Sequence, residues 1–117
     1  MIAYQPARRI HLAASGLIAA MAFIHIGLAI PIYREWSPDA AWFVGTGIGL
    51  LLLAALNLAH IGLEPCRQPT ARFVRAVNWL YALFGLTTLL AVPEPQAVAL
   101  AFLLVVQSLV ASRTLPG

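Results

Sequence analysis

The feature that constrains this chain most is a set of four long stretches without a single charged residue. Short charged segments separate these stretches, which cover residues 10–33, 40–63, 76–93 and 95–112. A helix needs about 20 apolar residues to cross the hydrocarbon core of a bilayer, with a range of about 17–25. Each stretch therefore has the length of one membrane-spanning helix, and the sequence predicts four of them.

Composition supports the same conclusion. The chain of 117 residues is 62% hydrophobic and 9% charged, whereas soluble domains are about 45–50% apolar and about 25% charged. A soluble domain of this size could not bury so much apolar surface. We expect one domain over residues 1–117, an all-α integral membrane protein whose four transmembrane helices form an antiparallel up-down bundle. The expected helices cover residues 11–32, 39–62, 71–92 and 96–112.

The last two stretches are the shortest, and only Pro93, Glu94 and Pro95 join them. A re-entrant hairpin that enters and leaves on one side of the membrane is the alternative arrangement for this part of the chain. Both arms still reach about 27 Å at 1.5 Å per residue, which favours two full spans.

The arginines predict the orientation of the bundle. In a four-span arrangement six of the seven fall on one side of the membrane, and only Arg34 falls on the other. Because arginine and lysine are enriched in cytoplasmic loops, both termini should be cytoplasmic. The absence of lysine beside abundant alanine, leucine, arginine and proline favours a GC-rich bacterial source. We therefore expect a multi-pass protein of the bacterial inner (cytoplasmic) membrane.

Polar residues in the predicted spans fall on helical stripes. On the first span His11, Ser15, Ile18, Ala22 and His25 follow one another at intervals of three or four residues and share one face. Such a stripe should face the other helices, because the remaining surface suits lipid. Residues equidistant from a turn lie at similar depth in antiparallel neighbours. This matching predicts an interhelical polar layer of Asn57, Asn78, Tyr81 and Gln107.

The same matching places His25 opposite Thr46 and a cluster of glycines on the second span. We expect any small polar pocket in the outer half of the bundle to be bounded by His25, Thr46, Gly49 and Thr88. A neutral imidazole there must satisfy one N–H and one lone pair. Thr46 or Thr88 could provide this hydrogen bond, which would make His25 a structural residue. The alternative roles for His25 are a haem ligand, a proton relay or a substrate contact.

His11 and His60 match in depth near the cytoplasmic interface and form a weak candidate metal site. Two histidines do not complete a metal site, although Glu64 and Cys66 lie close in sequence. The single cysteine excludes an internal disulfide and any paired-cysteine motif. No cofactor is expected, with haem or a metal ion as the alternatives.

The residues that most enzyme mechanisms require are absent. No carboxylate lies within a span, and the sequence contains no hydrolytic triad and no glycine-rich phosphate loop. The arginines are scattered, so nucleic-acid binding is not expected. We expect a non-enzymatic accessory or interaction subunit or a homo-oligomer, whose partners are the lipid bilayer and other membrane proteins or itself. The alternatives are a small transporter or channel-like protein that uses the central polar stripe, or a haem- or metal-binding protein.

Overall fold

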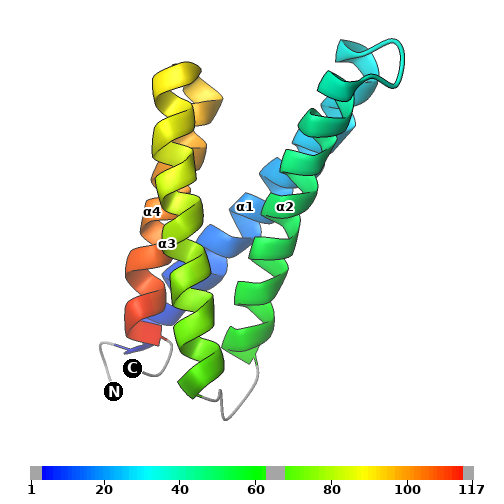
Figure 1. The fold of residues 1–117 in the computed structure, drawn as a ribbon. Helices are drawn as coiled ribbons and strands as arrows, with labels where there is room; N and C mark the ends of the chain where they lie inside the picture. The colour runs from blue at the N-terminus through cyan, green and yellow to red at the C-terminus, as the bar shows by residue number, and fades with distance from the viewer. Residues whose placement is uncertain (1–3, 63–67, 115–117) are drawn as a thin grey trace.

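A computed structural model describes residues 4–62 and 68–114 of the chain, and these residues form four α-helices (Figure 1). The helices are α1 (Tyr4–Ile32), α2 (Pro38–Gly62), α3 (Gln68–Ala91) and α4 (Pro95–Thr114). Each is long and apolar enough to cross a membrane. The predicted all-α fold with four candidate membrane-spanning helices is therefore confirmed.

The helices extend beyond the uncharged stretches from which they were predicted. α1 begins at Tyr4 and includes Arg8 and Arg9, and α4 continues through Arg113 to Thr114. An arginine does not interrupt a helix, because it is a good helix former, and its long stem lets the charged group extend toward water. The absence of charge thus marks the part of each helix that could span a membrane and not the end of the helix itself.

Local sequence sets the helix starts at the two tight turns. The Ser37 hydroxyl accepts a hydrogen bond from the Ala40 amide at 3.2 Å and caps the first turn of α2. Pro38 and Pro95 occupy the first positions of α2 and α4, where a missing amide proton costs nothing.

The bundle consists of two antiparallel hairpins, α1–α2 and α3–α4. α1 packs against both α2 and α4, and α3 packs against α4, whereas the α2–α3 interface is the smallest of the four. Figure 1 shows the hairpins close together at the end that holds both chain termini and spread apart at the opposite end.

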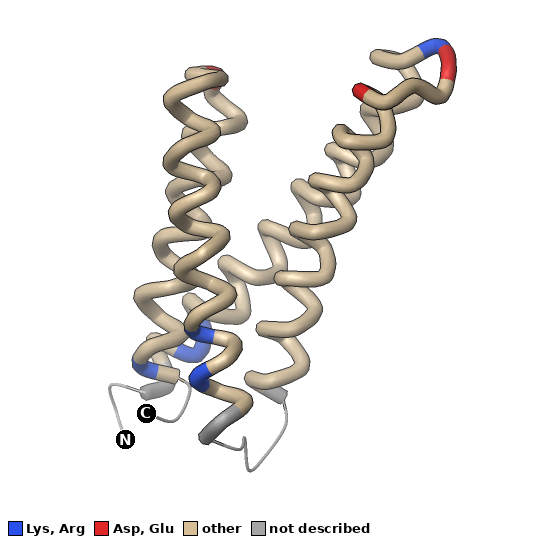
Figure 2. The backbone as a smooth tube through the Cα atoms, viewed as in Figure 1, with Lys and Arg blue, Asp and Glu red and all other residues tan. Residues whose placement is uncertain are grey.

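Charged residues mark the two ends of the bundle, and we name the ends after them. Figure 2 shows arginines gathered at the end with the termini, called here the arginine end. The acidic residues of the described ranges, together with Arg34, lie at the other end, called here the acidic end. No charged side chain lies between the two groups within the described helices, which matches the charge distribution expected of membrane spans.

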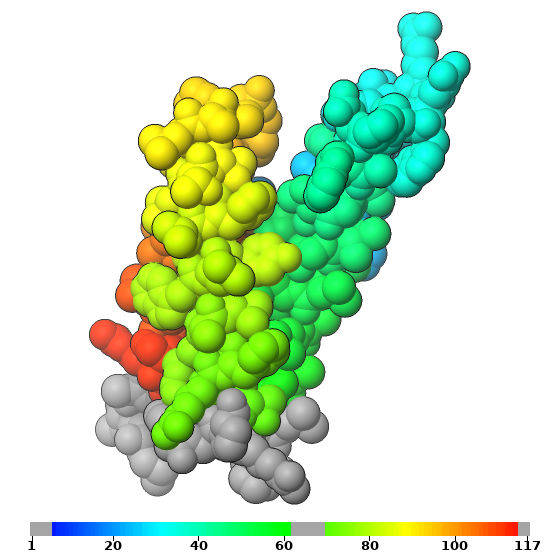
Figure 3. Space-filling view, in the orientation of Figure 1, coloured from blue at the N-terminus to red at the C-terminus, as the bar shows by residue number. Residues whose placement is uncertain are grey.

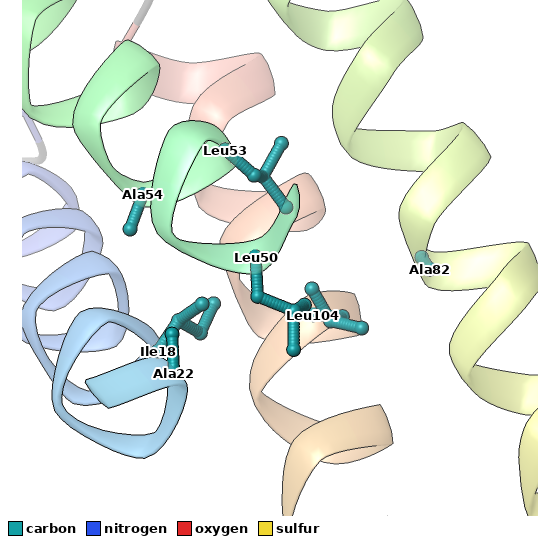
Figure 4. Packing of buried hydrophobic residues seen from close by; sticks show 7 residues of the cluster. All are labelled: Ile18, Ala22, Leu50, Leu53, Ala54, Ala82 and Leu104. Carbon is teal, nitrogen blue, oxygen red and sulfur yellow. The ribbon is translucent and has the colours of Figure 1, made fainter. Parts of the chain in front are cut away.

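An apolar cluster joins all four helices at mid-height. Its buried members are Ile18, Ala22, Leu50, Leu53, Ala54, Ala82 and Leu104. Figure 4 shows the side chains of Ile18, Leu50 and Leu104 converging from α1, α2 and α4. A Cβ atom at Gly85 would lie 2.8 Å from Leu104 Cδ1, so the missing side chain leaves room for this leucine between α3 and α4. Small residues at these contacts allow the helix backbones to approach closely.

Candidate functional site

Four buried polar side chains, one from each helix, form a connected group toward the arginine end of the bundle. The members of this four-helix polar cluster are His11, Asn57, Asn78 and Thr114. Their side chains are at most 8% exposed. Buried polar groups of this kind stabilise a membrane bundle only when they bond to one another.

The two asparagines exchange a pair of hydrogen bonds between α2 and α3. Asn57 Nδ2 donates to Asn78 Oδ1 at 2.7 Å, and Asn78 Nδ2 donates to Asn57 Oδ1 at 2.8 Å. Asn57 Nδ2 also donates to the carbonyl oxygen of Leu53 at 2.9 Å, which fixes the orientation of the amide. The contact between Asn57 and Asn78 that depth matching predicted is therefore present.

His11 connects this pair to α4. Its Nε2 lies 2.8 Å from Asn57 Oδ1, and its Nδ1 lies 2.6 Å from Thr114 Oγ1. Because the amide orientation leaves only an oxygen facing the ring, Nε2 must carry a proton and donate it. In the neutral imidazole Nδ1 is then an acceptor, and the Thr114 hydroxyl has one proton to share between this nitrogen and the carbonyl oxygen of Val110, 3.1 Å away. Both ring nitrogens are thus engaged within the protein.

Thr114 was not among the residues expected in the polar layer. The expected fourth helix stopped at residue 112, because the uncharged stretch ends just before Arg113. The structure continues α4 by one more residue beyond that arginine, which brings the threonine hydroxyl to His11. The signal in the sequence was the spacing Gln107, Val110, Thr114, which has helical periodicity and was not followed.

A second polar contact lies one helical turn above His11. Gln107 Nε2 donates to Ser15 Oγ at 3.0 Å across the α1–α4 interface. Among the buried side-chain nitrogen and oxygen atoms of the described residues, Gln107 Oε1 alone has no hydrogen-bond partner. The structure therefore divides the expected polar layer, with the asparagines in one contact and Gln107 in another.

Tyr81, the fourth residue expected in the polar layer, joins neither contact. Its ring is half-buried and packs edge-on against Phe84, with ring centroids 6.4 Å apart and an interplanar angle of 80°. Its hydroxyl oxygen lies 2.5 Å from the point that a Cβ atom at Gly49 would occupy. The absence of a side chain at Gly49 thus makes room for the tip of Tyr81 on α2.

His25 lies between α1 and α2 toward the acidic end. Its Nε2 donates to the carbonyl oxygen of Phe43 at 2.9 Å, and its ring stacks on the Phe43 ring with centroids 3.8 Å apart. The glycine opposite the imidazole is Gly47, where a Cβ atom would lie 3.2 Å from His25 Cδ2. His25 therefore faces a neighbouring helix, and its partner is a backbone carbonyl group.

The structure does not bring Thr46 and Thr88 to His25. Each hydroxyl donates to a carbonyl oxygen of its own helix, Thr46 to Trp42 and Thr88 to Phe84. Because α1 packs against α2 and α4, a side chain between α1 and α2 is remote from Thr88 on α3. Thr46 is on α2, but it lines the side of that helix that faces α3. The four residues expected around one outer pocket are distributed over separate interfaces.

A cleft is present instead between α2 and α3, where the hairpins begin to diverge. Its volume is about 480 Å³, and it is lined by Trp42, Gly45, Thr46, Leu80, Tyr81 and Phe84. Figure 3 shows the hollow between these helices on the face in view. The sequence singled out Thr46 and Tyr81, but nothing in the spacing of the aromatic residues indicated that they would line one cleft.

His60, the other half of the weak metal site, bonds to its own helix. Its Nδ1 lies 2.8 Å from the carbonyl oxygen of Leu56. Within residues 4–62 and 68–114 no group of three histidine, cysteine, aspartate or glutamate side chains is arranged to hold a metal ion. Glu64 and Cys66 lie outside the described residues, so the metal site remains a prediction.

No known protein family, curated protein or solved structure matches the chain.

Proposed function

We propose that the chain is a small multi-pass protein of the bacterial inner membrane that works by binding and not by catalysis. Its role is that of an accessory or interaction subunit, or of a homo-oligomer. The observation that carries the proposal is that the buried polar side chains form hydrogen bonds with one another between helices. His11, Asn57, Asn78 and Thr114 bond to one another and join the helices, so these groups serve assembly.

The charge distribution supports the proposed orientation. Arg8, Arg9, Arg72, Arg75 and Arg113 belong to helix turns at the arginine end, which would face the cytoplasm. The exposed tryptophans Trp36 and Trp42 lie toward the acidic end, where aromatic side chains would meet the outer lipid interface.

The outer surface of the bundle supports lateral contacts within the membrane. Large apolar side chains face outward on all four helices, among them Ile30, Leu52, Leu90 and Phe102, each at least 65% exposed. In a bilayer such a surface is solvated by lipid tails, and a partner helix can replace them by closer packing.

A small transporter is the second candidate, because one observation favours it. A column of buried polar groups runs from Thr114 through His11 to Ser15 and Gln107, and it ends in the unpaired Gln107 Oε1. The apolar cluster around Ile18 and Leu104 lies directly above this column. A solute path would have to open that layer, so the binding role agrees better with the geometry.

Photo-cross-linking in native membranes tests the proposal. A benzophenone amino acid is placed at exposed Ile30 on α1, Leu90 on α3 or Leu109 on α4, and at fully buried Ala54 as the control. We expect a discrete cross-linked product from at least one exposed position and none from the control. A product that persists with the purified protein in liposomes identifies a homo-oligomer, and one found only in native membranes identifies a partner. No product at any exposed position, together with solute or proton flux in liposomes, would refute the binding role.

A further inference from the structure

The cleft between α2 and α3 is an open hollow with the size and the lining of a small-molecule site, although Trp42, Leu80 and Phe84 are exposed at its rim. Its volume of about 480 Å³ falls within the range of small-molecule pockets, about 300–1,000 Å³. Three of its six lining residues are aromatic, Trp42, Tyr81 and Phe84, and none carries a charge. Such a lining favours a flat apolar molecule, since aromatic faces and edges attract other rings.

The polar groups of the lining narrow the choice of molecule. The Tyr81 hydroxyl and the Trp42 indole N–H form no hydrogen bond with the part of the chain that the structure describes. Both groups are donors. Thr46 already uses its hydroxyl proton on the Trp42 carbonyl oxygen at 2.9 Å. The lining therefore has two free donors. The Trp42 N–H lies toward the acidic end, where water and lipid headgroups can bond it, so the Tyr81 hydroxyl is the donor that calls for an acceptor on the ligand.

The position of the donors along the helices adds a second argument. Trp42 lies in the second turn of α2, close to the acidic end, whereas Tyr81 lies near the middle of α3. At mid-span there is no water to bond the tyrosine hydroxyl, and an unpaired polar group in hydrocarbon is unfavourable. A lipid tail has no acceptor to offer it, but a carbonyl oxygen on a ring within the cleft would.

Gly45 also lines the cleft. A Cβ atom built there would meet nothing within 4 Å, so the backbone of α2 leaves open space at this point. The missing side chain keeps one wall flat beside the aromatic rings.

We propose that the cleft between α2 and α3 binds a flat lipophilic ring that carries carbonyl oxygens, the chemistry of a quinone. Trp42 and Phe84 contact the ring faces, and the Tyr81 hydroxyl donates a hydrogen bond to a carbonyl oxygen. This inference rests on the proposed binding role and assigns the class of molecule bound. The proposal concerns binding of the quinone only and includes no chemical reaction.

Quenching of Trp42 fluorescence tests the assignment. The chain has three tryptophans, so Trp36→Phe and Trp79→Phe make Trp42 the only one. The protein is placed in nanodiscs of saturated phosphatidylcholine and titrated with a benzoquinone that bears a decyl tail. We expect saturable quenching, which decylbenzene, having the same tail without the oxygens, does not displace.

Three variants distinguish the cleft from general partitioning into lipid. Gly45→Leu fills the open space, and we expect it to abolish saturable quenching. Gly27→Leu is the matched control, because Gly27 is an exposed glycine of α1 that also has nothing within 4 Å of its Cβ position. Tyr81→Phe removes only the hydroxyl oxygen and should weaken binding roughly threefold to tenfold, as expected for one neutral hydrogen bond.

Two results would overturn the assignment. Quenching that rises linearly with the quinone, or that is the same in the Gly45→Leu and Gly27→Leu proteins, would show that the cleft is not the site. Displacement by decylbenzene combined with an unchanged affinity in Tyr81→Phe would show a groove for lipid tails. If cross-linking to a partner persists in either case, the ligand assignment alone fails and the binding role stands.

Discussion

Replacement of Asn57 by Leu tests the energetic role of the four-helix polar cluster. Asn57 takes part in three interhelical hydrogen bonds, two with Asn78 and one with His11. The substitution removes all three and leaves the Asn78 amide and the His11 Nε2–H unpaired. Interhelical hydrogen bonds in membranes average about 0.6 kcal/mol and reach at most about 1.7 kcal/mol. We therefore expect the free energy of unfolding to fall by roughly 2 kcal/mol.

The assay is reversible unfolding in mixed micelles by SDS titration, followed by circular dichroism. Asn78→Leu removes two of the same bonds and should cost about 1 kcal/mol. The double variant should cost less than the two singles together, by about 1 kcal/mol, because the shared pair is lost only once. Ala55→Leu, at an exposed position of the same helix, is the control and should change little. Strict additivity would refute the contact, and equal losses for the two singles would show that the His11 bond contributes nothing.

Further predictions concern topology and single side chains. Cysteine labelling at Arg34, Arg67 and Glu94 should report outside, inside and outside, and a cytoplasmic Glu94 would contradict the four-span arrangement. His25→Gln should be tolerated with a loss below about 1.5 kcal/mol in the SDS assay, because Gln still donates to a carbonyl oxygen of α2 and only the ring stacking is lost. Abolished function in a folded His25→Gln protein would instead indicate a cofactor or a proton relay. Gln107→Met should change stability by less than about 1 kcal/mol, because loss of the Nε2–Ser15 hydrogen bond is offset by removal of the buried unpaired Oε1; a loss above about 2 kcal/mol would mean that an internal water or ligand bonds to Oε1.

The four helices follow from the sequence because one physical requirement dominates. A backbone in hydrocarbon must satisfy its own hydrogen bonds, and a helix of about 20 apolar residues is the simplest solution. The level of each residue along the bundle is equally predictable, since antiparallel helices rise by the same amount per residue from a shared turn. That rule was sufficient to find the contact between Asn57 and Asn78.

The depth of a residue along its helix does not determine in which direction around the helix axis its side chain points. The remaining expectations differ from the structure for this reason. Tyr81 lies at the expected level, yet its hydroxyl reaches Gly49 on α2 and leaves Gln107 to Ser15. His25 likewise has the glycines of α2 at its level but meets Gly47, whose Cβ position it crowds, and not Gly49. Which of several residues at one depth meet is decided by the crossing angle of the helices. The order of packing, with α1 beside α4, was also not contained in the periodicity.

The divergence of the hairpins is a shape that a bilayer permits. Within the described helices the last buried residue toward the acidic end is Ala22 on α1, Gly85 on α3 and Ala101 on α4. Beyond that level the two hairpins separate: α1 stays in contact with α2 through His25 and Phe43, and α3 stays beside α4 up to the turn that joins them. In water the exposed leucines and phenylalanines would close such a gap, because burial of apolar surface is favourable. In lipid they gain little by closing it, since acyl chains solvate them as well as a neighbouring helix does. The polar cluster at the arginine end therefore holds the two hairpins in register, and the cleft lies where that cluster no longer draws α2 and α3 together.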